Sequence, residues 1–292
     1  MSQPRNRWLV RIILALAVTA FLGVSVIPII SAINNPSPSN QNAASTSSTV
    51  PSDQISKLQD EVRGYQMVLQ REPENQTALN GLLQARLQLL SLRQGDIQGV
   101  IEPLEKLAQL NPEQSEYGVL LAQAKQQMGD LEGSAQAYRS ILDTKPGDLK
   151  ALQGMVALLV DQQRPEAAIG LLEDTLSNAE PANKIQPGSV DTVAIQVLLG
   201  TVHASQKRYP QANSVYDQAI KKDPQDFRPV LAKAMLFREQ GKVEEAKPLF
   251  DSAVALAPAQ YKDEINRAAA SPSPAPAPAE TSETPSEESS ED

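Results

Sequence analysis

The stretch from Val193 to Pro224 reads VAIQVLLGTVHASQKRYPQANSVYDQAIKKDP, and its spacing of small and large residues returns at other places in the chain. Small residues let two helices approach closely, large residues fill the space between them, and a proline ends a helix and turns the chain back. The pattern therefore predicts a pair of packed helices that is repeated along the chain. Counted from Val193, positions 7, 8, 20, 24, 27 and 32 are held by Leu199, Gly200, Ala212, Tyr216, Ala219 and Pro224.

This spacing resembles the tetratricopeptide repeat, a helix-turn-helix unit of 34 residues. The same 34 residues separate Pro112 from Pro146 and Pro224 from Pro258. The resemblance implies an all-α fold, a right-handed superhelical solenoid of antiparallel helix pairs in which each repeat stacks on its neighbours. Aromatic residues make up only 4% of the chain, so we expect a core that consists mainly of Leu, Ala, Ile and Val.

We expect the repeat domain to cover residues 53–270, with some irregularity along its length. Its first part, 53–73, would be a half-repeat that caps the array. The segment 181–191, PANKIQPGSVD, contains two prolines and a glycine and predicts an exposed loop, which is either a functional insertion or a tolerated lengthening. In the expected repeat 113–146, Ser134 stands at position 20, where the repeat pattern usually has Ala. Full repeats are expected at 75–112, 113–146, 147–181, 191–224 and 225–258, and a capping helix at 259–270.

The N-terminal part of the chain predicts attachment to a membrane. Residues 12–33 form a run of 22 residues without a charge. As a helix this run would extend about 33 Å and cross a bilayer core of about 30 Å. We interpret it as an uncleaved signal-anchor transmembrane helix, with a cleaved signal peptide as the alternative. Because Arg5, Arg7 and Arg11 precede it, the positive-inside rule predicts that residues 1–11 are cytoplasmic and that the repeat domain lies on the periplasmic or lumenal side.

Two further segments lack the large apolar residues that a folded core needs. Residues 34–52 consist mainly of Asn, Ser, Thr, Ala and Pro, which predicts a flexible linker. Residues 271–292 are rich in Pro, Ser and acidic residues, which predicts a disordered acidic tail.

The composition argues against several classes of function. The net charge is −9, and beyond residue 33 the chain holds 23 basic and 35 acidic residues, so its surface would repel the phosphates of nucleic acids. The chain has no Cys and a single His, His203, which argues against a zinc site and leaves His203 as an expected packing residue. No glycine-rich phosphate loop, catalytic triad or paired-carboxylate site is recognisable. We therefore expect no enzyme activity, no metal, no cofactor and no small-molecule substrate.

The resemblance also implies where a partner would bind. In this family, the first helix of each repeat lines the concave side of the solenoid, and this groove holds a protein or peptide ligand. The lysine and asparagine that form a carboxylate clamp in some members are absent, and Gln153 and Ala157 stand at those positions in one repeat. The expected groove residues are Glu116, Gln123, Gln127, Lys150, Gln153, Asp161, Thr201, Arg228, Met235 and Arg238.

The expected function follows from this layout, which resembles that of membrane-anchored repeat proteins of bacterial or cyanobacterial type. The chain would be a membrane-anchored scaffold or adaptor that binds a protein partner in its concave groove. The alternative is a chaperone-like factor for the assembly or biogenesis of membrane or exported protein complexes, such as a translocon, cytochrome complexes or thylakoid complexes. Both expectations rest on analogy with proteins of similar layout.

Overall fold

The structure is a computed structural model that describes residues 52–271, and within this range it consists of thirteen α-helices without a strand. The all-α fold predicted from the sequence is confirmed for this part of the chain. The expected cytoplasmic segment, the expected transmembrane helix and nearly all of the expected linker and acidic tail lie outside the described residues. The division of residues 53–270 into individual repeats stays a prediction.

The chain divides into two compact units, residues 1–215 and residues 216–292, which we call unit 1 and unit 2. The boundary falls inside helix α12 (Tyr209–Lys222). The preceding helices are α3 (Ser52–Arg71), α4 (Gln76–Ser91), α5 (Gln98–Leu110), α6 (Ser115–Gln127), α7 (Leu131–Thr144), α8 (Leu149–Asp161), α9 (Pro165–Ser177), α10 (Ala179–Ile185) and α11 (Thr192–Ser205). The following helices are α13 (Phe227–Glu239), α14 (Val243–Leu256) and α15 (Ala259–Ala270).

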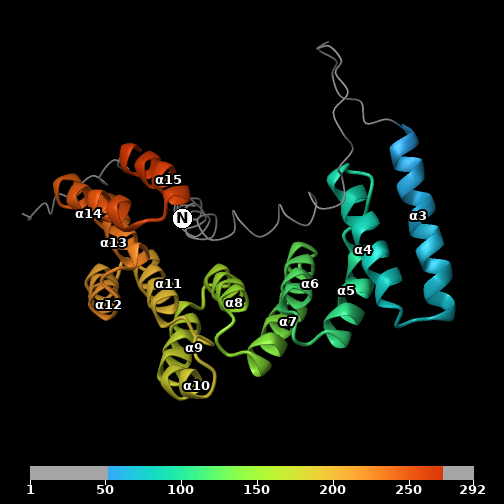
Figure 1. The fold of residues 1–292 in the computed structure, drawn as a ribbon, viewed down its shortest axis with the longest axis horizontal. Helices are drawn as coiled ribbons and strands as arrows, with labels where there is room; N and C mark the ends of the chain where they lie inside the picture. Colours follow the sequence, from blue (N-terminus) through green and yellow to red (C-terminus); the bar gives the residue numbers. More distant parts are fainter. Residues whose placement is uncertain (1–51, 272–292) are drawn as a thin grey trace, which may run out of the picture. The chain divides into compact units, whose positions relative to one another are not determined.

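In unit 1, most helices pack against their neighbours in the chain, as the repeats of a solenoid do. Helices α4, α6 and α8 lie along one side of this series and α5, α7 and α9 along the other (Figure 1). In addition, α6 packs directly against α8, and α9 packs against α11, past the short α10. The first helices of successive pairs therefore form one layer, and the second helices form another.

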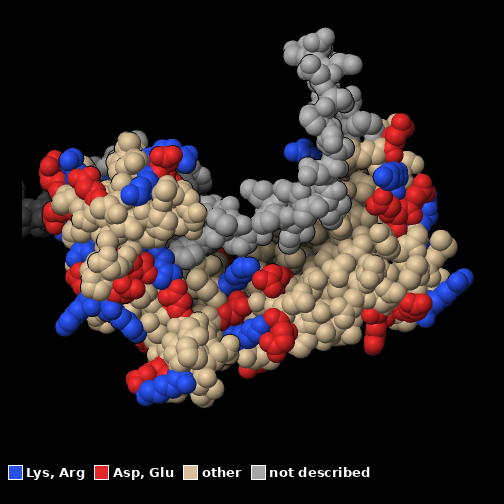
Figure 2. Space-filling view, viewed as in Figure 1, with Lys and Arg blue, Asp and Glu red and all other residues tan. Residues whose placement is uncertain are grey.

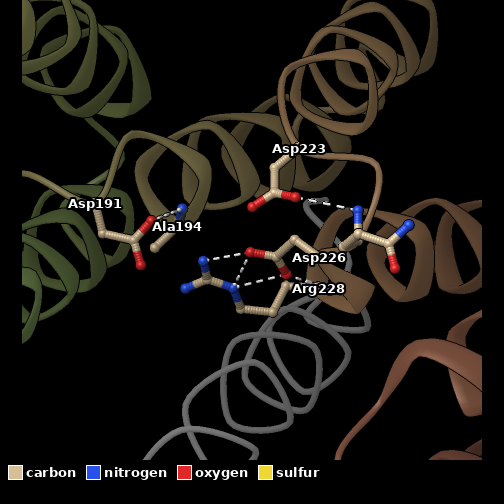
Figure 3. Close-up of polar contacts among 6 residues, drawn as sticks. Asp191, Ala194, Asp223, Asp226 and Arg228 are labelled. Carbon is tan, nitrogen blue, oxygen red and sulfur yellow. Dashed lines mark hydrogen bonds and ion pairs between the residues drawn. The ribbon is translucent and has the colours of Figure 1, made fainter.

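Acidic or amide side chains begin most of the first helices. Figure 3 shows two of these caps: the Asp191 carboxylate accepts the N–H of Ala194 at 3.0 Å, and the Asp226 carboxylate accepts the N–H of Arg228 at 2.8 Å. Such a cap contributes about 1 kcal/mol to helix stability. Four first helices have such a cap, and three of the four capping residues stand two residues after a proline, so the same short segment ends one helix and begins the next. The caps are Asn75 of α4, Asp148 of α8, Asp191 of α11 and Asp226 of α13.

Two tyrosines of second helices pack directly on glycines of the following first helices. A Cβ atom placed on Gly154 of α8 would lie 2.3 Å from Cζ of Tyr138 on α7, and a Cβ atom on Gly81 of α4 would lie 2.2 Å from Cζ of Tyr65 on α3. Tyr138 is only 1% exposed, and burial raises its pKa to about 12. These contacts set how closely α7 approaches α8 and α3 approaches α4.

Ser134 of α7 is fully buried at 0% exposed, and its Oγ atom has no hydrogen-bond partner in the described structure. An unpaired buried hydroxyl costs about 1–3 kcal/mol. We therefore expect Ser134→Ala to raise the free energy of unfolding by about 1 kcal/mol, measured by urea denaturation followed by circular dichroism. Ser140→Ala, at an exposed position of the same helix, is the control and should change stability by less than about 0.5 kcal/mol. A loss of stability in Ser134→Ala would show that the hydroxyl makes a useful bond.

The insertion between α9 and α11 is folded, in contrast to the exposed loop expected over residues 181–191. That expectation is wrong for residues 181–185, which belong to α10. Pro181 lies in the first turn of this helix, where a missing N–H leaves no helical hydrogen bond unmade. The rest of the segment is held by Asn183, whose Nδ2 donates to the carbonyl of Val190 at 2.9 Å and whose Oδ1 accepts the Val190 N–H at 2.9 Å. Val190 is thereby buried in the main core of unit 1.

In unit 2, α13 packs against α14, and α14 packs against α15. The rings of Phe227 and Tyr261 stack with their centroids 5.4 Å apart. Helix α15 covers apolar side chains of the helices before it, as a terminal helix of a solenoid does. The core residues of this unit include Val230, Ala234, Phe250, Ala253 and Ile265.

The structure corrects the predicted localisation as a single-pass membrane protein with its repeats on the periplasmic or lumenal side. Within residues 52–271, none of the helices combines the length and the apolar character that a membrane crossing requires. In most of them the apolar residues are interrupted by polar ones, because the helix buries one face against its neighbours and exposes the other. The run 12–33, on which the prediction was based, lies outside the described residues.

Candidate interaction surface

The residues expected to line a binding groove lie on α6, α8 and α11 of unit 1 and on α13 of unit 2. The structure brings together those on α6 and α8, because these two helices pack against each other. All six are exposed or half-buried, so their side chains are accessible to a partner. They are Glu116, Gln123 and Gln127 on α6 and Lys150, Gln153 and Asp161 on α8.

An ion pair joins α6 to α8 at one end of this surface. Nζ of Lys150 lies 3.3 Å from Oε1 of Glu116, and the two residues are 34 positions apart in the chain. The pKa of Glu116 is lowered, first by a hydrogen bond from its own backbone N–H and then by the Lys150 ammonium. Both side chains remain partly exposed, so the pair contributes at most about 1 kcal/mol to stability. Its main consequence is that the two charges compensate each other.

Helix α4 extends the same surface on the other side of α6. The hydroxyl of Tyr117 on α6 donates to Oδ1 of Asn80 on α4 at 3.0 Å. The exposed residues of α4 follow helical spacing and share one face. Together with α6 and α8 they form what we call the first-helix face: Asn80, Gln84, Leu87 and Gln88 of α4, Leu120, Gln123 and Gln127 of α6, and Gln153 of α8.

Residues of α4 were not among those expected from the repeat spacing to line the groove. Pro73 and Pro112 are separated by 39 residues, so the regular register could not be carried onto this repeat. A usable signal was present in the segment itself. Polar residues recur at Asn80, Gln84 and Gln88, four residues apart, which places them on one side of a helix.

Charged side chains of α4 and α6 form hydrogen bonds or ion pairs with other parts of the protein. The guanidinium of Arg86 on α4 donates to the carbonyl of Gly99. Nζ of Lys125 on α6 lies 2.8 Å from Oε1 of Glu105 on α5. Figure 2 shows that the surface between α3 and α8 is largely free of Lys, Arg, Asp and Glu in this view, whereas charged side chains gather on α3.

Thr201 of α11 does not belong to an accessible surface, in contrast to the expectation. It is buried at 5% exposed, and its Oγ1 donates to the carbonyl of Val197 at 2.8 Å. The repeat register placed Thr201 on the groove side, but α11 is buried over most of its length. Threonine in a helix readily satisfies its hydroxyl on the preceding turn, so its polarity is no sign of a binding role.

The three expected residues of unit 2 make contacts within that unit. Arg228 forms an ion pair with Asp226, with Nη2 and Oδ2 2.5 Å apart (Figure 3). Arg238 donates to the carbonyl of Ala268 on α15 and lies over the ring of Phe250 at 5.5 Å. Met235 is half-buried and packs against the core of the unit. These residues thus stabilise α13 and its contact with α15.

His203 of α11 is buried at 9% exposed, as expected of a packing residue. Its pKa is lowered, first by burial and then by the nearby charge of Arg208, which both disfavour the protonated imidazole. Arg208 itself pairs with Glu166 of α9. Within residues 52–271, no group of three or more His, Asp or Glu residues is placed to hold a metal ion.

Residues 154–227 and 197–261 match a family model described as Tetratricopeptide repeat. The tetratricopeptide repeat is thus recognised over residues 154–261 of this chain. The matched residues begin within α8 and end within α15. The match starts one residue after Gln153, so the first-helix face lies outside the matched range, where α4 to α7 show the same pairwise packing.

Two curated proteins are similar to parts of this chain. Cellulose synthase operon protein C of Pseudomonas fluorescens is 27% identical over 151 residues, which are 52% of this chain and 12% of that protein. Protein SLOW GREEN 1, chloroplastic, of Arabidopsis thaliana is 28% identical over 204 residues, which are 70% of this chain and 62% of that protein. The chain thus spans less than two thirds of the length of either relative.

A solved structure, that of yeast Tom70, has the same kind of fold. It is similar with a TM-score of 0.50 at 15% sequence identity, and the similarity covers 87% of this chain and 45% of that one. At this identity the likeness shows the fold alone. The fold that the two proteins share therefore extends over most of this chain.

Proposed function

We propose that this protein is a scaffold that binds a protein partner on the first-helix face of unit 1. The observation that carries the proposal is the continuity of this face across three helices. The Tyr117–Asn80 hydrogen bond joins α6 to α4, and the Glu116–Lys150 pair joins α6 to α8. Solenoid proteins use extended surfaces of this kind for binding, because each repeat adds one helix to the surface.

The side chains on this face suit binding better than chemistry. They comprise five glutamines, one asparagine and two leucines, which can hydrogen-bond or pack but offer no nucleophile and no acid or base. Leu87 and Leu120 are each 40% exposed, so they can lose apolar area to a partner. The face is therefore a site for association with another chain.

A second candidate is a chaperone-like factor for the assembly or biogenesis of protein complexes. The likeness over 70% of this chain to SLOW GREEN 1, a protein whose name places it in the chloroplast, agrees with the thylakoid form of this candidate but names no role in assembly. Such a factor would also use the first-helix face, but with subunits of a complex as transient clients. The masses of crosslinked products separate the two candidates, because a scaffold yields one partner and an assembly factor yields several subunits of one complex.

A photo-crosslinking amino acid introduced in place of Gln123 or Gln153 tests the proposal in cells that contain the full chain. We expect each position to trap a discrete partner. The matched controls are Gln109 on α5 and Gln136 on α7, which are exposed glutamines of second helices. Labelling from these controls that equals labelling from the first-helix face would contradict the proposal.

A further inference from the structure

We propose that the partner is held as an extended, uncharged segment, recognised mainly through its backbone by the amide side chains of the first-helix face. This inference rests on the proposed scaffold function and adds the chemical class of the ligand. It is carried by the way charge is distributed between the two layers of helices in unit 1.

The three first helices carry few charged residues, although the chain as a whole is acidic with a net charge of −9. Four of these charged residues already have a partner inside the protein. The fifth, Asp161, is exposed at the C-terminal end of α8. The five are Arg86, Glu116, Lys125, Lys150 and Asp161.

The second helices α5, α7 and α9, in contrast, carry many charged residues and are acidic. Their acidic residues outnumber their basic residues, and most of them are exposed. A highly acidic partner would be repelled by this field, and a basic partner would be drawn toward the second helices. An uncharged segment is therefore the ligand that the first-helix face favours over the rest of the surface. Glu105 and Glu166 are paired with Lys125 and Arg208, and the other acidic residues of these helices are Glu102, Glu132, Asp143, Glu173 and Asp174.

The amide groups of the face match the backbone of an extended chain. A glutamine or asparagine carboxamide offers both a donor and an acceptor, as a peptide bond does. Asn80, Gln84 and Gln88 supply such groups on α4, and Gln123 and Gln127 supply them on α6. A backbone that lies across the helices can therefore exchange its hydrogen bonds with water for bonds to these side chains. Recognition of this kind does not require a charge on the ligand.

Leu87 and Leu120 provide the apolar part of the face. They lie among the amides on neighbouring first helices, and each keeps 40% of its surface exposed. Apolar side chains of the bound segment can cover them, at about 25 cal/mol per Å² of buried apolar area. The ligand class is thus a segment without charges that carries some apolar side chains.

Binding of the full chain to an array of immobilised synthetic peptides tests the proposed ligand class directly. Packed helices lie about 8–10 Å apart and an extended chain advances about 3.3 Å per residue, so peptides of about ten residues span all three helices. The array holds equal numbers of acidic, basic and uncharged peptides. We expect the uncharged peptides to retain the protein, with binding that changes less than about twofold when salt rises from about 0.1 M to about 1 M. Selection of charged peptides, loss of binding in salt or absence of any binding would overturn the inference.

Substitutions that keep the shape of the amide sharpen the test. Gln84→Glu combined with Gln123→Glu introduces two charges on the face and should weaken binding of the selected peptides about tenfold. Gln136→Glu on α7 is the matched control and should leave binding unchanged. Circular dichroism of each variant checks that the helices are intact. Equal binding by the double variant and the control would contradict recognition by the amides.

The outcomes separate this inference from the proposed function. Crosslinks from Gln123 together with selection of charged peptides would leave the scaffold in place and overturn the uncharged ligand. Absence of crosslinks from both Gln123 and Gln153 would overturn the scaffold function and, with it, this inference.

Discussion

Gly154→Ala is expected to lower the free energy of unfolding by about 1–3 kcal/mol, although alanine is the better helix former. The added Cβ would lie 2.3 Å from Cζ and 2.4 Å from Oη of Tyr138. Tyr138 is 1% exposed and enclosed by the main core of unit 1, so its ring has little room to move away. Either α7 and α8 must separate or the ring must leave its position, and both changes lose packing that the core depends on.

Urea denaturation followed by circular dichroism measures this loss against two matched controls. Gly170 on α9 and Gly64 on α3 also lie inside helices, but nothing lies within 4 Å of a Cβ added to either. Gly170→Ala and Gly64→Ala should therefore gain about 0.5–1 kcal/mol from helix propensity. A gain of similar size in Gly154→Ala would mean that Tyr138 does not limit the approach of α7 to α8.

Helices and their pairing could be predicted from the sequence because the pattern that produces them is local. Leu199, Gly200, Ala212, Tyr216 and Ala219 occupy the marked positions of the repeat, and all five are buried. The repeat marks these positions by their spacing alone, so a count along the chain is enough to place them. The same count assigned α6 and α8 to one surface.

Contacts between specific side chains of different repeats could not be predicted by counting positions along the chain. Tyr138 and Gly154 come from different helix pairs, and Gly154 is not one of the small residues that mark the repeat. The fold of the insertion depends on Asn183, because its bonds to Val190 arise only after the segment has turned back on itself. Counting prolines and glycines therefore predicted a loop where part of the segment is helical.

The candidate site could be predicted in part, for the same reason. Regular spacing placed Gln123 and Gln153 on one side, and the structure shows them on packed helices. It failed for α4, where the interval between prolines is longer, and for Thr201, whose helix is buried. The charge pairing at Lys125 was also out of reach, since its partner Glu105 lies on a second helix. The exposure of a side chain and its ion pairs decide whether a partner can contact it, and both depend on how the helices pack.

Gly147→Ala is expected to cost about 3 kcal/mol, at the upper end for overpacking, because the obstacle is backbone. The added Cβ would lie 2.3 Å from the carbonyl oxygen of Ser189 and 2.8 Å from Cγ2 of Val190. Gly147 lies in the turn between α7 and α8, and the segment it meets is held in place by Asn183. The substitution must therefore push the insertion away from the array or distort the turn.

Two measurements distinguish a displaced insertion from general loss of stability. Trypsin cleavage after Lys184, which lies on α10 close to this segment, should become faster in Gly147→Ala under native conditions, while Gly170→Ala should cleave at the rate of the unchanged chain. Val190→Ala removes the side-chain obstacle but leaves the Ser189 carbonyl and the Cα atom of residue 190, so the double variant with Gly147→Ala should not recover stability. Full recovery in the double variant would show that only the Val190 side chain stands in the way, and that the backbone of the insertion is free to adjust.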